Sequence, residues 1–232
     1  MQEDKVEELT SYLSGFVSEA RRRRMERVLA ERTRWVTLAL EDIYQPHNAS
    51  AVLRSCECFG VQDVHIIEDR NEYDPSPRVD MGSSGWLTLK RYDEGSDNTT
   101  LALDVLRQRG YKLVATTPHR DDCLLEDLAV EQPLALLFGT EETGLSERAM
   151  AAADAFVRIP MYGFTESFNI SVCAALMLHE LTRKIRAEKI LWTLSTEEKA
   201  ELRLQWYRQS IRGVEHIERR YWAERGVVED GA

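Results

Sequence analysis

Three short segments of the sequence carry polar side chains in patterns that could support catalysis. In the first, residues 45–54, Asn48 stands at the start of an expected helix and Arg54 follows about one and a half helical turns later. A guanidinium offers five donors in a rigid fork, so Arg54 could hold an anion or a hydroxyl group. The alternative is a surface arginine on a solvated helix face, because arginine is seldom buried.

The second segment, residues 138–146, places two carboxylates between two glycines. Gly139 and Gly144 flank Glu141 and Glu142 directly after an apolar run, and glycine lets a backbone approach a ligand closely. No lysine follows the second glycine and two acids would repel phosphate, so this is not a phosphate loop. The turn suits a cationic or hydroxyl-bearing ligand; the alternative is a plain strand-to-helix turn whose carboxylates favour the helix dipole.

The third segment, residues 159–171, brings Ser167 and Asn169 to the start of a long expected helix. Simple N-capping by either side chain is the alternative to a role in binding. We expect no metal site, because neither the cysteines nor the histidines have the spacing of metal ligands.

The elements expected around these segments alternate between strands and helices. Short apolar runs predict strands, and runs rich in Glu, Arg, Leu and Ala predict helices. The expected strands are 35–40, 64–67, 86–89, 111–116, 134–138 and 155–159, and the expected helices are 3–32 with a break near Gly15, 49–59, 101–109, 145–152, 169–186 and 196–224. This alternation is typical of an α/β fold in which a mostly parallel sheet has helices on both faces. We expect this core at 34–186, with helical extensions at 1–33 and 187–232.

Each polar segment follows one of the expected strands. In open α/β sheets, ligands bind at the carboxyl ends of the strands. The three segments are therefore placed where a ligand site is expected.

The charge is distributed unevenly along the chain. A net charge of −10, taken alone, argues against a nucleic-acid partner. Residues 35–182, however, hold 11 basic and 24 acidic side chains, whereas residues 18–34 hold seven Arg against three Glu and residues 183–225 hold 11 basic against seven acidic side chains. An acidic middle flanked by two basic segments indicates that an anionic partner would be held at the ends.

The composition is typical of a soluble globular protein. Hydrophobic residues make up 43% and charged residues 30% of the chain, and no run of about 18 apolar residues predicts a membrane span. The acidic N-terminal segment lacks the apolar core of a secretion signal, and four cysteines do not make a disulfide scaffold. We expect a reducing, cytoplasmic location.

Together and in this order, the three segments resemble the motifs of the TrmH (SpoU-type) family within the SPOUT class of RNA ribose 2′-O-methyltransferases. The first motif is matched by Asn48 through Arg54, the second by Phe138, Gly139, Glu141 and Gly144 with Ile159-Pro160-Met161 downstream, and the third by Ser167, Asn169 and Ser171. The resemblance covers about residues 34–185.

The resemblance implies a fold, a cofactor and an assembly. In this family the C-terminal part of the α/β sheet threads a deep trefoil knot, whose loops bind S-adenosylmethionine. The positions aligned with the cofactor contacts are Thr116, Gly139, Ile159 and Phe168. Members of the family are homodimers whose active site takes residues from both subunits.

The resemblance also implies methyl transfer to a ribose 2′-hydroxyl, with Arg54 as the principal catalytic residue. Asn48 is expected to orient Arg54 or the ribose, while Glu141, Ser167 and Asn169 shape the pocket and hold the substrate. Because the pKa of arginine lies above about 12, we expect Arg54 to bind the adjacent phosphate and stabilise the developing alkoxide rather than act as a base.

The two ends of the chain resemble those of family members that methylate guanosine 18 in the D loop of tRNA. We expect tRNA phosphates to be bound by the basic tail and by the arginine cluster Arg21, Arg22, Arg23 and Arg24. The aromatic side chains of the tail, Trp206, Tyr207, Tyr221 and Trp222, could stack on bases or instead pack the terminal helices on each other. Two alternative functions remain open: the same reaction on ribosomal RNA or another tRNA position, and a non-catalytic RNA-binding homologue.

Overall fold

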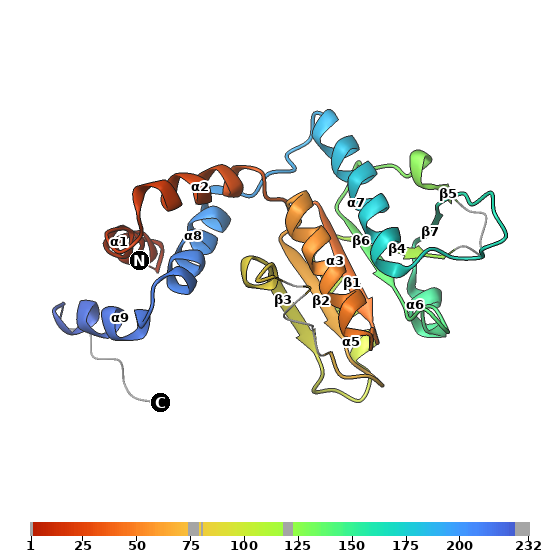
Figure 1. Cartoon of the computed structure of the whole chain (residues 1–232), viewed down its shortest axis with the longest axis horizontal. Helices are drawn as coiled ribbons and strands as arrows, with labels where there is room; N and C mark the ends of the chain where they lie inside the picture. The colour runs from red at the N-terminus through yellow and green to blue at the C-terminus, as the bar shows by residue number, and fades with distance from the viewer. Residues whose placement is uncertain (1, 74–78, 80, 118–122, 226–232) are drawn as a thin grey trace. The chain divides into compact units, whose positions relative to one another are not determined.

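The chain is divided into two compact units. A computed structural model describes residues 2–73, 79, 81–117 and 123–225, with side chains from residue 5 onward. One unit, here called the terminal unit, combines Met1–Arg32 with Thr193–Ala232, and the other, the sheet unit, is Thr33–Trp192 (Figure 1). Residues from both ends of the chain thus belong to one compact unit.

The sheet unit is built on a seven-stranded sheet in the order β3-β2-β1-β6-β4-β7-β5, and every pairing among its strands is parallel. The strands are β1 Val36–Glu41, β2 Asp63–Ile67, β3 Thr88–Tyr92, β4 Lys112–Thr116, β5 Cys123–Leu124, β6 Leu134–Phe138 and β7 Ala155–Arg158. The expected parallel α/β sheet is confirmed. The sequence pattern did not predict β5, because two residues are too few to leave a periodic signal.

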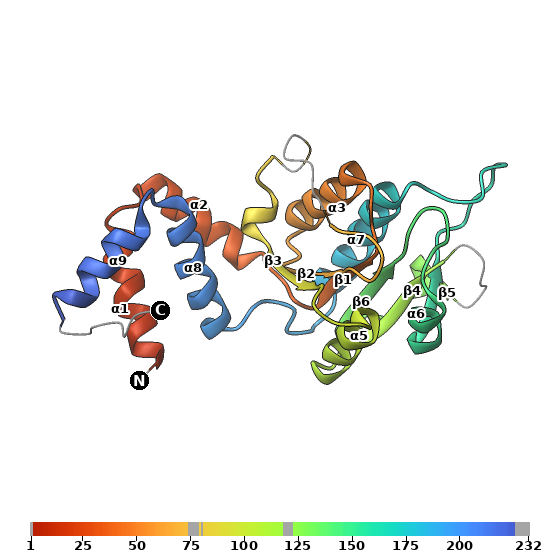
Figure 2. The ribbon, with the colours of Figure 1, turned by 90° about the horizontal axis from the view of Figure 1, so that it is seen from below.

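Helices cover both faces of this sheet. The helices of the sheet unit are α3 Pro46–Phe59, α5 Asn98–Gln108, α6 Glu147–Ala152 and α7 Ile170–Ala187, with short 3₁₀ turns η1 Ser84–Trp86 and η2 Leu125–Asp127. Figure 2 shows α3 and α7 on one face and α5 and α6 on the other. Each pair encloses its own buried apolar cluster against the sheet. The central strands β1 and β6 are buried along their whole length, which is why they consist of near-continuous apolar runs.

Helix α3 has clear start and stop signals in the sequence. Pro46 occupies the first helical turn, where its missing N–H costs nothing. Gly60 ends the helix with φ 79°, a left-handed conformation in which its N–H bonds the carbonyls of Cys56 and Glu57.

The regular elements of the terminal unit, in the described part of the chain, are four helices. Its helices are α1 Gln2–Ser14, α2 Glu19–Ala30, α8 Thr196–Ser210 and α9 Val214–Ala223. The expected break near Gly15 separates α1 from α2. The single helix expected at 196–224 was wrong, because Gly213 adopts φ 68° and separates α8 from α9.

Three aromatic side chains of the tail form the core of the terminal unit. Trp206, Tyr207 and Tyr221 are buried, and the guanidinium of Arg32 lies 5.4 Å from the centre of the Trp206 ring. Because these three are not accessible to a base, the alternative that they pack the terminal helices together is confirmed.

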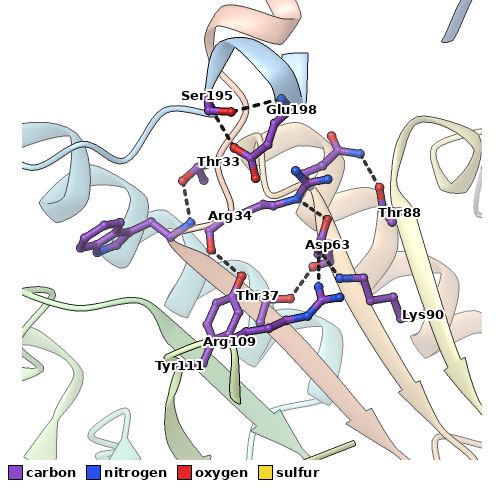
Figure 3. Close-up of polar contacts among 12 residues, drawn as sticks. Thr33, Arg34, Thr37, Asp63, Thr88, Lys90, Arg109, Tyr111, Ser195 and Glu198 are labelled. Carbon is purple, nitrogen blue, oxygen red and sulfur yellow. Dashed lines mark hydrogen bonds and ion pairs between the residues drawn. The ribbon is translucent and has the colours of Figure 1, made fainter. Parts of the chain in front are cut away.

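Four charged residues meet at the amino ends of the strands, a group here called the amino-edge cluster (Figure 3). The Asp63 carboxylate is almost fully buried and accepts hydrogen bonds from Arg34 Nε at 2.9 Å and Lys90 Nζ at 2.7 Å. A guanidinium nitrogen of Arg109 lies 3.9 Å away. Burial alone would raise the pKa of Asp63, but the charges and hydrogen bonds of Arg34 and Lys90 lower it below its ordinary value.

His65 lies next to this cluster inside the sheet. Its Nδ1 is 2.8 Å from the Tyr92 hydroxyl, whereas its buried Nε2 has no hydrogen-bond partner in the described structure. Burial, reinforced by the charge of Lys90, lowers the pKa of His65 to about 4. The imidazole is therefore neutral at physiological pH.

Candidate active site

The carboxyl ends of β6, β4 and β7 surround a cavity of about 750 Å³, here called the main cavity. Its walls include the residues that end these strands, Phe138, Thr116 and Arg158, and the loops that follow them. This volume lies within the range of small-molecule and cofactor sites. The cavity therefore lies at the carboxyl edge of the sheet, where the sequence predicted a ligand site.

All four expected cofactor-binding residues line this cavity: Thr116, Gly139, Ile159 and Phe168. Thr116 is anchored, because its hydroxyl donates to the Leu137 carbonyl at 2.8 Å. Three of the expected catalytic residues, Glu141, Ser167 and Asn169, lie in the same lining.

Gly139 is required by a close approach of two backbone segments. A Cβ added there would lie 2.1 Å from the carbonyl of Gly144 and 2.2 Å from the nitrogen of Leu145. The loop between the glycines is closed by Thr140 N donating to Gly144 O at 3.1 Å and Gly144 N donating to Thr140 O at 3.0 Å. Gly144 itself has φ 69°, which favours glycine.

One asparagine joins the three polar segments of the sequence. Asn169 Nδ2 donates to Asn48 Oδ1 at 3.0 Å and to Glu141 Oε1 at 2.7 Å. Its Oδ1 accepts from the backbone N–H of Ser171 at 2.9 Å, so it also caps α7. Asn169 therefore has both roles: its amide oxygen caps α7, and its amide nitrogen connects Asn48 with Glu141.

Arg54 does not reach the main cavity within this chain. Its side chain is exposed on α3, it is absent from the cavity lining, and its guanidinium lies 3.2 Å from the sulfur of Met81. The structure thus brings Asn48 to the other motifs but leaves Arg54, six residues later, on the surface.

The main cavity carries a negative balance of charge. Glu141, Glu142 and Glu166 line it together with one cation, Arg158. Such a lining favours a positively charged ligand over a phosphate group. Burial raises the pKa of Cys173, another lining residue, to about 11, so its thiol is not ionised and is not a nucleophile.

A second cavity of about 430 Å³, the side cavity, adjoins the main one. It lies at the carboxyl ends of β1 and β2, where Glu41 and Asp42, and then Arg70 and Asn71, follow or end the strands. Sequence reasoning missed this cavity, although the rule that ligands bind at strand ends would have pointed to these polar pairs.

Two other kinds of feature are absent from the described residues. No group of three or more His, Cys, Asp or Glu side chains there is arranged to hold a metal ion. Among the described helices, none combines the length and apolarity that crossing a membrane requires.

Comparison with known proteins places this geometry in context. Residues 35–179 match the model of the SpoU rRNA Methylase family. The chain is 42% identical to the tRNA (guanosine(18)-2′-O)-methyltransferase of Borreliella burgdorferi, over 93% of this chain and 97% of that protein. The A. aeolicus TrmH/SpoU tRNA modifying enzyme superposes with a TM-score of 0.74 at 25% identity, covering 83% of this chain and 98% of that one.

A further similar structure contains a ligand. The SpoU methyltransferase AviRb from Streptomyces viridochromogenes, in complex with the cofactor AdoMet, superposes with a TM-score of 0.58 at 26% identity. The similarity covers 70% of this chain and 62% of that one.

Proposed function

Because the chain belongs to the SpoU rRNA Methylase family, we propose that it transfers a methyl group from S-adenosylmethionine to the ribose 2′-hydroxyl of guanosine 18 in tRNA. The observation that carries this proposal is the hydrogen-bonded group Asn48–Asn169–Glu141, which joins three distant segments at the wall of the main cavity. The relative from Borreliella burgdorferi, similar along nearly its whole length, bears this activity in its name.

The main cavity fits the proposed methyl donor. The carboxylates of Glu141, Glu142 and Glu166 suit a cationic ligand, while apolar lining residues such as Ile159 and Phe168 suit an aromatic base. When bound, S-adenosylmethionine supplies a methyl group already activated on a sulfonium. The protein's task is therefore to place the hydroxyl and to stabilise the charge that develops on its oxygen.

We assign that stabilisation to Arg54 of a second copy of the chain. The reaction would replace the bond between the methyl carbon and sulfur by a bond to the 2′-oxygen, leaving a neutral thioether, and the hydroxyl proton would pass to solvent water. A guanidinium beside the 2′-oxygen would stabilise the negative charge and hold the neighbouring phosphate. Arg54 lies outside the cavity lining of its own chain, which is the position expected of a residue that completes a partner's site.

An exposed apolar surface supports this homodimer. Val172 and Leu176 lie one turn apart on the outer side of α7 and are 46% and 41% exposed, and Phe164 and Phe168 are exposed in the loop before it. Apolar side chains grouped in this way are typical of an interface between proteins. Association of two copies through this surface would cover it close to the main cavity, which Phe168 also lines.

The trefoil knot is part of the same proposal. Its support is the sheet order, in which β6 lies between β1 and β4 while β7 lies beyond β4. The similarity to the A. aeolicus TrmH/SpoU enzyme, over 98% of that chain, supports a fold of the family in which the resemblance of the motifs implies the knot.

We propose that tRNA is held by the outward-facing arginines of α2. Arg22 donates to the Ser14 carbonyl at 2.9 Å, and Arg23 pairs with Glu19 on the same helix. Arg24 is exposed and has no side-chain partner within the described residues. Of the cluster Arg21–Arg24, it is therefore the best placed to bind a phosphate.

The function is tested by methyl transfer from labelled S-adenosylmethionine to a tRNA transcript. We expect one methyl group per tRNA, at the 2′-oxygen of guanosine 18, and no transfer when that nucleotide is 2′-deoxyguanosine. Methylation of ribosomal RNA or of a different tRNA nucleotide would replace the proposed target with another. RNA binding without any transfer would indicate a non-catalytic homologue.

The shared active site is tested by mixing two inactive variants. Arg54→Ala and Asn169→Ala should each lose activity, but a heterodimer contains one site in which both residues are intact. Unfolding and reassembling an equal mixture should restore about a quarter of the wild-type activity, because half of the dimers are then mixed. No recovery in a mixture that forms dimers would place Arg54 in its own chain's site.

The arginine cluster is tested by the salt dependence of tRNA binding. Arg24→Ala should reduce the slope of log affinity against log salt by about one. The matched control is Arg183→Ala in α7, whose guanidinium is paired with Glu180, and it should leave the slope unchanged. Equal slopes for wild type and Arg24→Ala would remove Arg24 from the RNA-binding surface.

A further inference from the structure

We propose that the side cavity receives the guanine base of the target nucleotide and that the carboxylate of Glu142 selects it. This inference rests on the proposed function, because it assumes that a ribose is presented to the main cavity.

The two cavities adjoin each other through one loop. Thr140, Glu142, Thr143 and Gly144 belong to the linings of both. The main cavity extends over the carboxyl ends of β6, β4 and β7, whereas the side cavity extends over those of β1 and β2. A nucleotide whose ribose lies at the boundary can therefore place its base on the side away from the methyl donor.

The side cavity is acidic, and one of its carboxylates is uncommitted. Glu41 is saturated, because its oxygens accept from the Ser146 backbone N–H at 2.8 Å and from the hydroxyls of Ser146 and Thr99, each at 2.7 Å. Glu142 is exposed, and its carboxylate has no hydrogen-bond or ion-pair partner in the part of the chain that the structure describes. Glu142 is thus free to accept from a ligand with both oxygens.

Asp42 provides a second, rigidly held acceptor. It adopts φ 55° at the end of β1, a conformation that non-glycine residues rarely take. Its Oδ1 accepts from three successive backbone N–H groups, those of residues 69–71, at 2.9, 2.8 and 3.3 Å. Its Oδ2 has no partner among the described residues. The residue is only 9% exposed, and it lines the side cavity. Backbone strain of this kind is often found at ligand sites.

These acceptors match guanine better than the other bases. On its Watson–Crick edge guanine carries two adjacent donors, the N1–H and the N2 amino group, which one carboxylate can accept together. Adenine, cytosine and uracil each offer there a single donor beside acceptors, which a carboxylate would repel. Reading the Watson–Crick edge of an unstacked base in this way is usual in RNA recognition.

Two further side chains of the side cavity suit a base. The Tyr44 ring is 41% exposed and lines the cavity, and exposed aromatic rings are common stacking partners for bases. Arg70 also lines it, and a guanidinium matches the O6 and N7 acceptors of guanine. The lining therefore offers acceptors, donors and a stacking surface to the same ligand.

The test compares tRNA substrates that carry guanosine, inosine or adenosine at the target position. Inosine lacks only the N2 amino group. With the wild-type protein we expect kcat/KM to fall by about tenfold for inosine and by more for adenosine, since one lost hydrogen bond to a charged group is worth about a factor of ten or more. Equal methylation of all three substrates would overturn the proposal without any variant being made.

The residue is tested with Glu142→Gln and a matched control. Glu142→Gln should lower kcat/KM for guanosine by about tenfold or more and bring the guanosine-to-inosine ratio close to one, because the carboxylate that reads the amino group is gone. Glu147→Gln removes the same charge from the first turn of α6, outside both linings, and should keep the wild-type ratio. A wild-type ratio in Glu142→Gln would overturn the assignment to Glu142.

Asp42→Asn gives a second measurement on the same cavity. The thermal unfolding of this variant is measured as well, because Asp42 also accepts hydrogen bonds from the backbone of residues 69–71. Among folded molecules the guanosine-to-inosine ratio should fall, and an unchanged ratio would remove Asp42 from the base site. Absence of methylation of any tRNA by the wild-type protein would overturn the proposed function and this inference with it, whereas methylation with ratios insensitive to Glu142 would overturn this inference alone.

Discussion

The two edges of the sheet use polar side chains in opposite ways. At the amino edge, the carboxylate of Asp63 is buried and bound by Arg34 and Lys90. At the carboxyl edge, Glu142 is exposed without a partner in the described structure, and two cavities adjoin it. The comparison shows that an exposed carboxylate without a partner among the described residues lies at the carboxyl ends of the strands, beside others such as Glu41 that are bound within the fold.

The carboxyl edge is also marked by a close contact between two backbone segments. The loop after β6 is so close to itself that only glycine fits at position 139. At this point of the carboxyl edge the backbone leaves no room for a side chain. Substitutions at the two edges should have separable effects on stability and on ligand binding, and the following measurements would break or sharpen that separation.

The largest effect is expected from Gly139→Ala. The added methyl group would overlap the backbone of Gly144 and Leu145, so the loop must move, and a displacement of about 1 Å can cost about 100-fold in activity. We expect kcat/KM for methyl transfer to fall by about that factor, and S-adenosylmethionine affinity, measured by calorimetry, to fall as well. The control is Gly163→Ala, where an added Cβ would have no atom within 4 Å. Normal binding by Gly139→Ala would contradict the tight turn.

At the opposite edge, Asp63→Asn should destabilise the fold and spare the reaction. It leaves Arg34 and Lys90 beside an uncharged buried amide, and breaking a buried pair costs roughly 3 kcal/mol when its cations keep some contact with water. Denaturant unfolding measures this loss, and kcat of the folded fraction should stay within about twofold of wild type. The control is Asp93→Asn, whose exposed pair with Arg91 should contribute less than about 0.5 kcal/mol. A large fall in kcat would show that the edges are coupled.

Acid should weaken the fold through His65. The pKa of this imidazole is about 4 when folded and 6.5 in its ordinary state, so below pH 6.5 the unfolded chain binds a proton that the folded chain does not. Stability from this residue should decrease by about 2 to 3 kcal/mol between pH 7 and pH 4.5. Unfolding of wild type and His65→Gln across this range isolates the contribution. Parallel stability curves for the two proteins would refute it.

The smallest effect is expected from Arg109→Ala. Its side chain is 50% exposed and lies 3.9 Å from Asp63, so its loss should change the free energy of unfolding by less than about 0.5 kcal/mol. The change should shrink further in high salt. A loss as large as that of Asp63→Asn would mean that the cations of the cluster act as one unit.

The carboxyl edge was largely predictable from the sequence, and the amino edge was not. The strand at 134–138 is a bounded apolar run and was found where expected, and the glycines and carboxylates that follow it in sequence also follow it in space. Asp63, by contrast, meets cations that come from residues 34, 90 and 109. Their convergence depends on the order of strands in the sheet, which no local pattern encodes.

The same limit explains what was missed in the site. Asn169 could be read as a helix cap from its neighbours alone, but its bonds to Asn48 and Glu141 span 121 and 28 positions of the chain. Arg54 stands in a recognisable motif, yet no local pattern shows that its side chain lies outside the main cavity of its own chain. The position of Asp42 after a strand was a signal that was overlooked, but its left-handed backbone conformation could not be predicted, because no local sequence pattern marks it.

The composition of the terminal unit has a consequence for how the protein folds during its synthesis. Helices α1 and α2 pack on α8, and Thr33–Trp192 separates them in the chain. During synthesis, domains generally fold as they emerge. The sheet unit can therefore fold before α8, on which α1 and α2 pack, has been synthesised. Until α8 leaves the ribosome, the apolar side chains of Leu13 and Leu29, buried in the finished protein, must remain uncovered. The nascent chain is therefore vulnerable to aggregation at α1 and α2 until α8 has been synthesised.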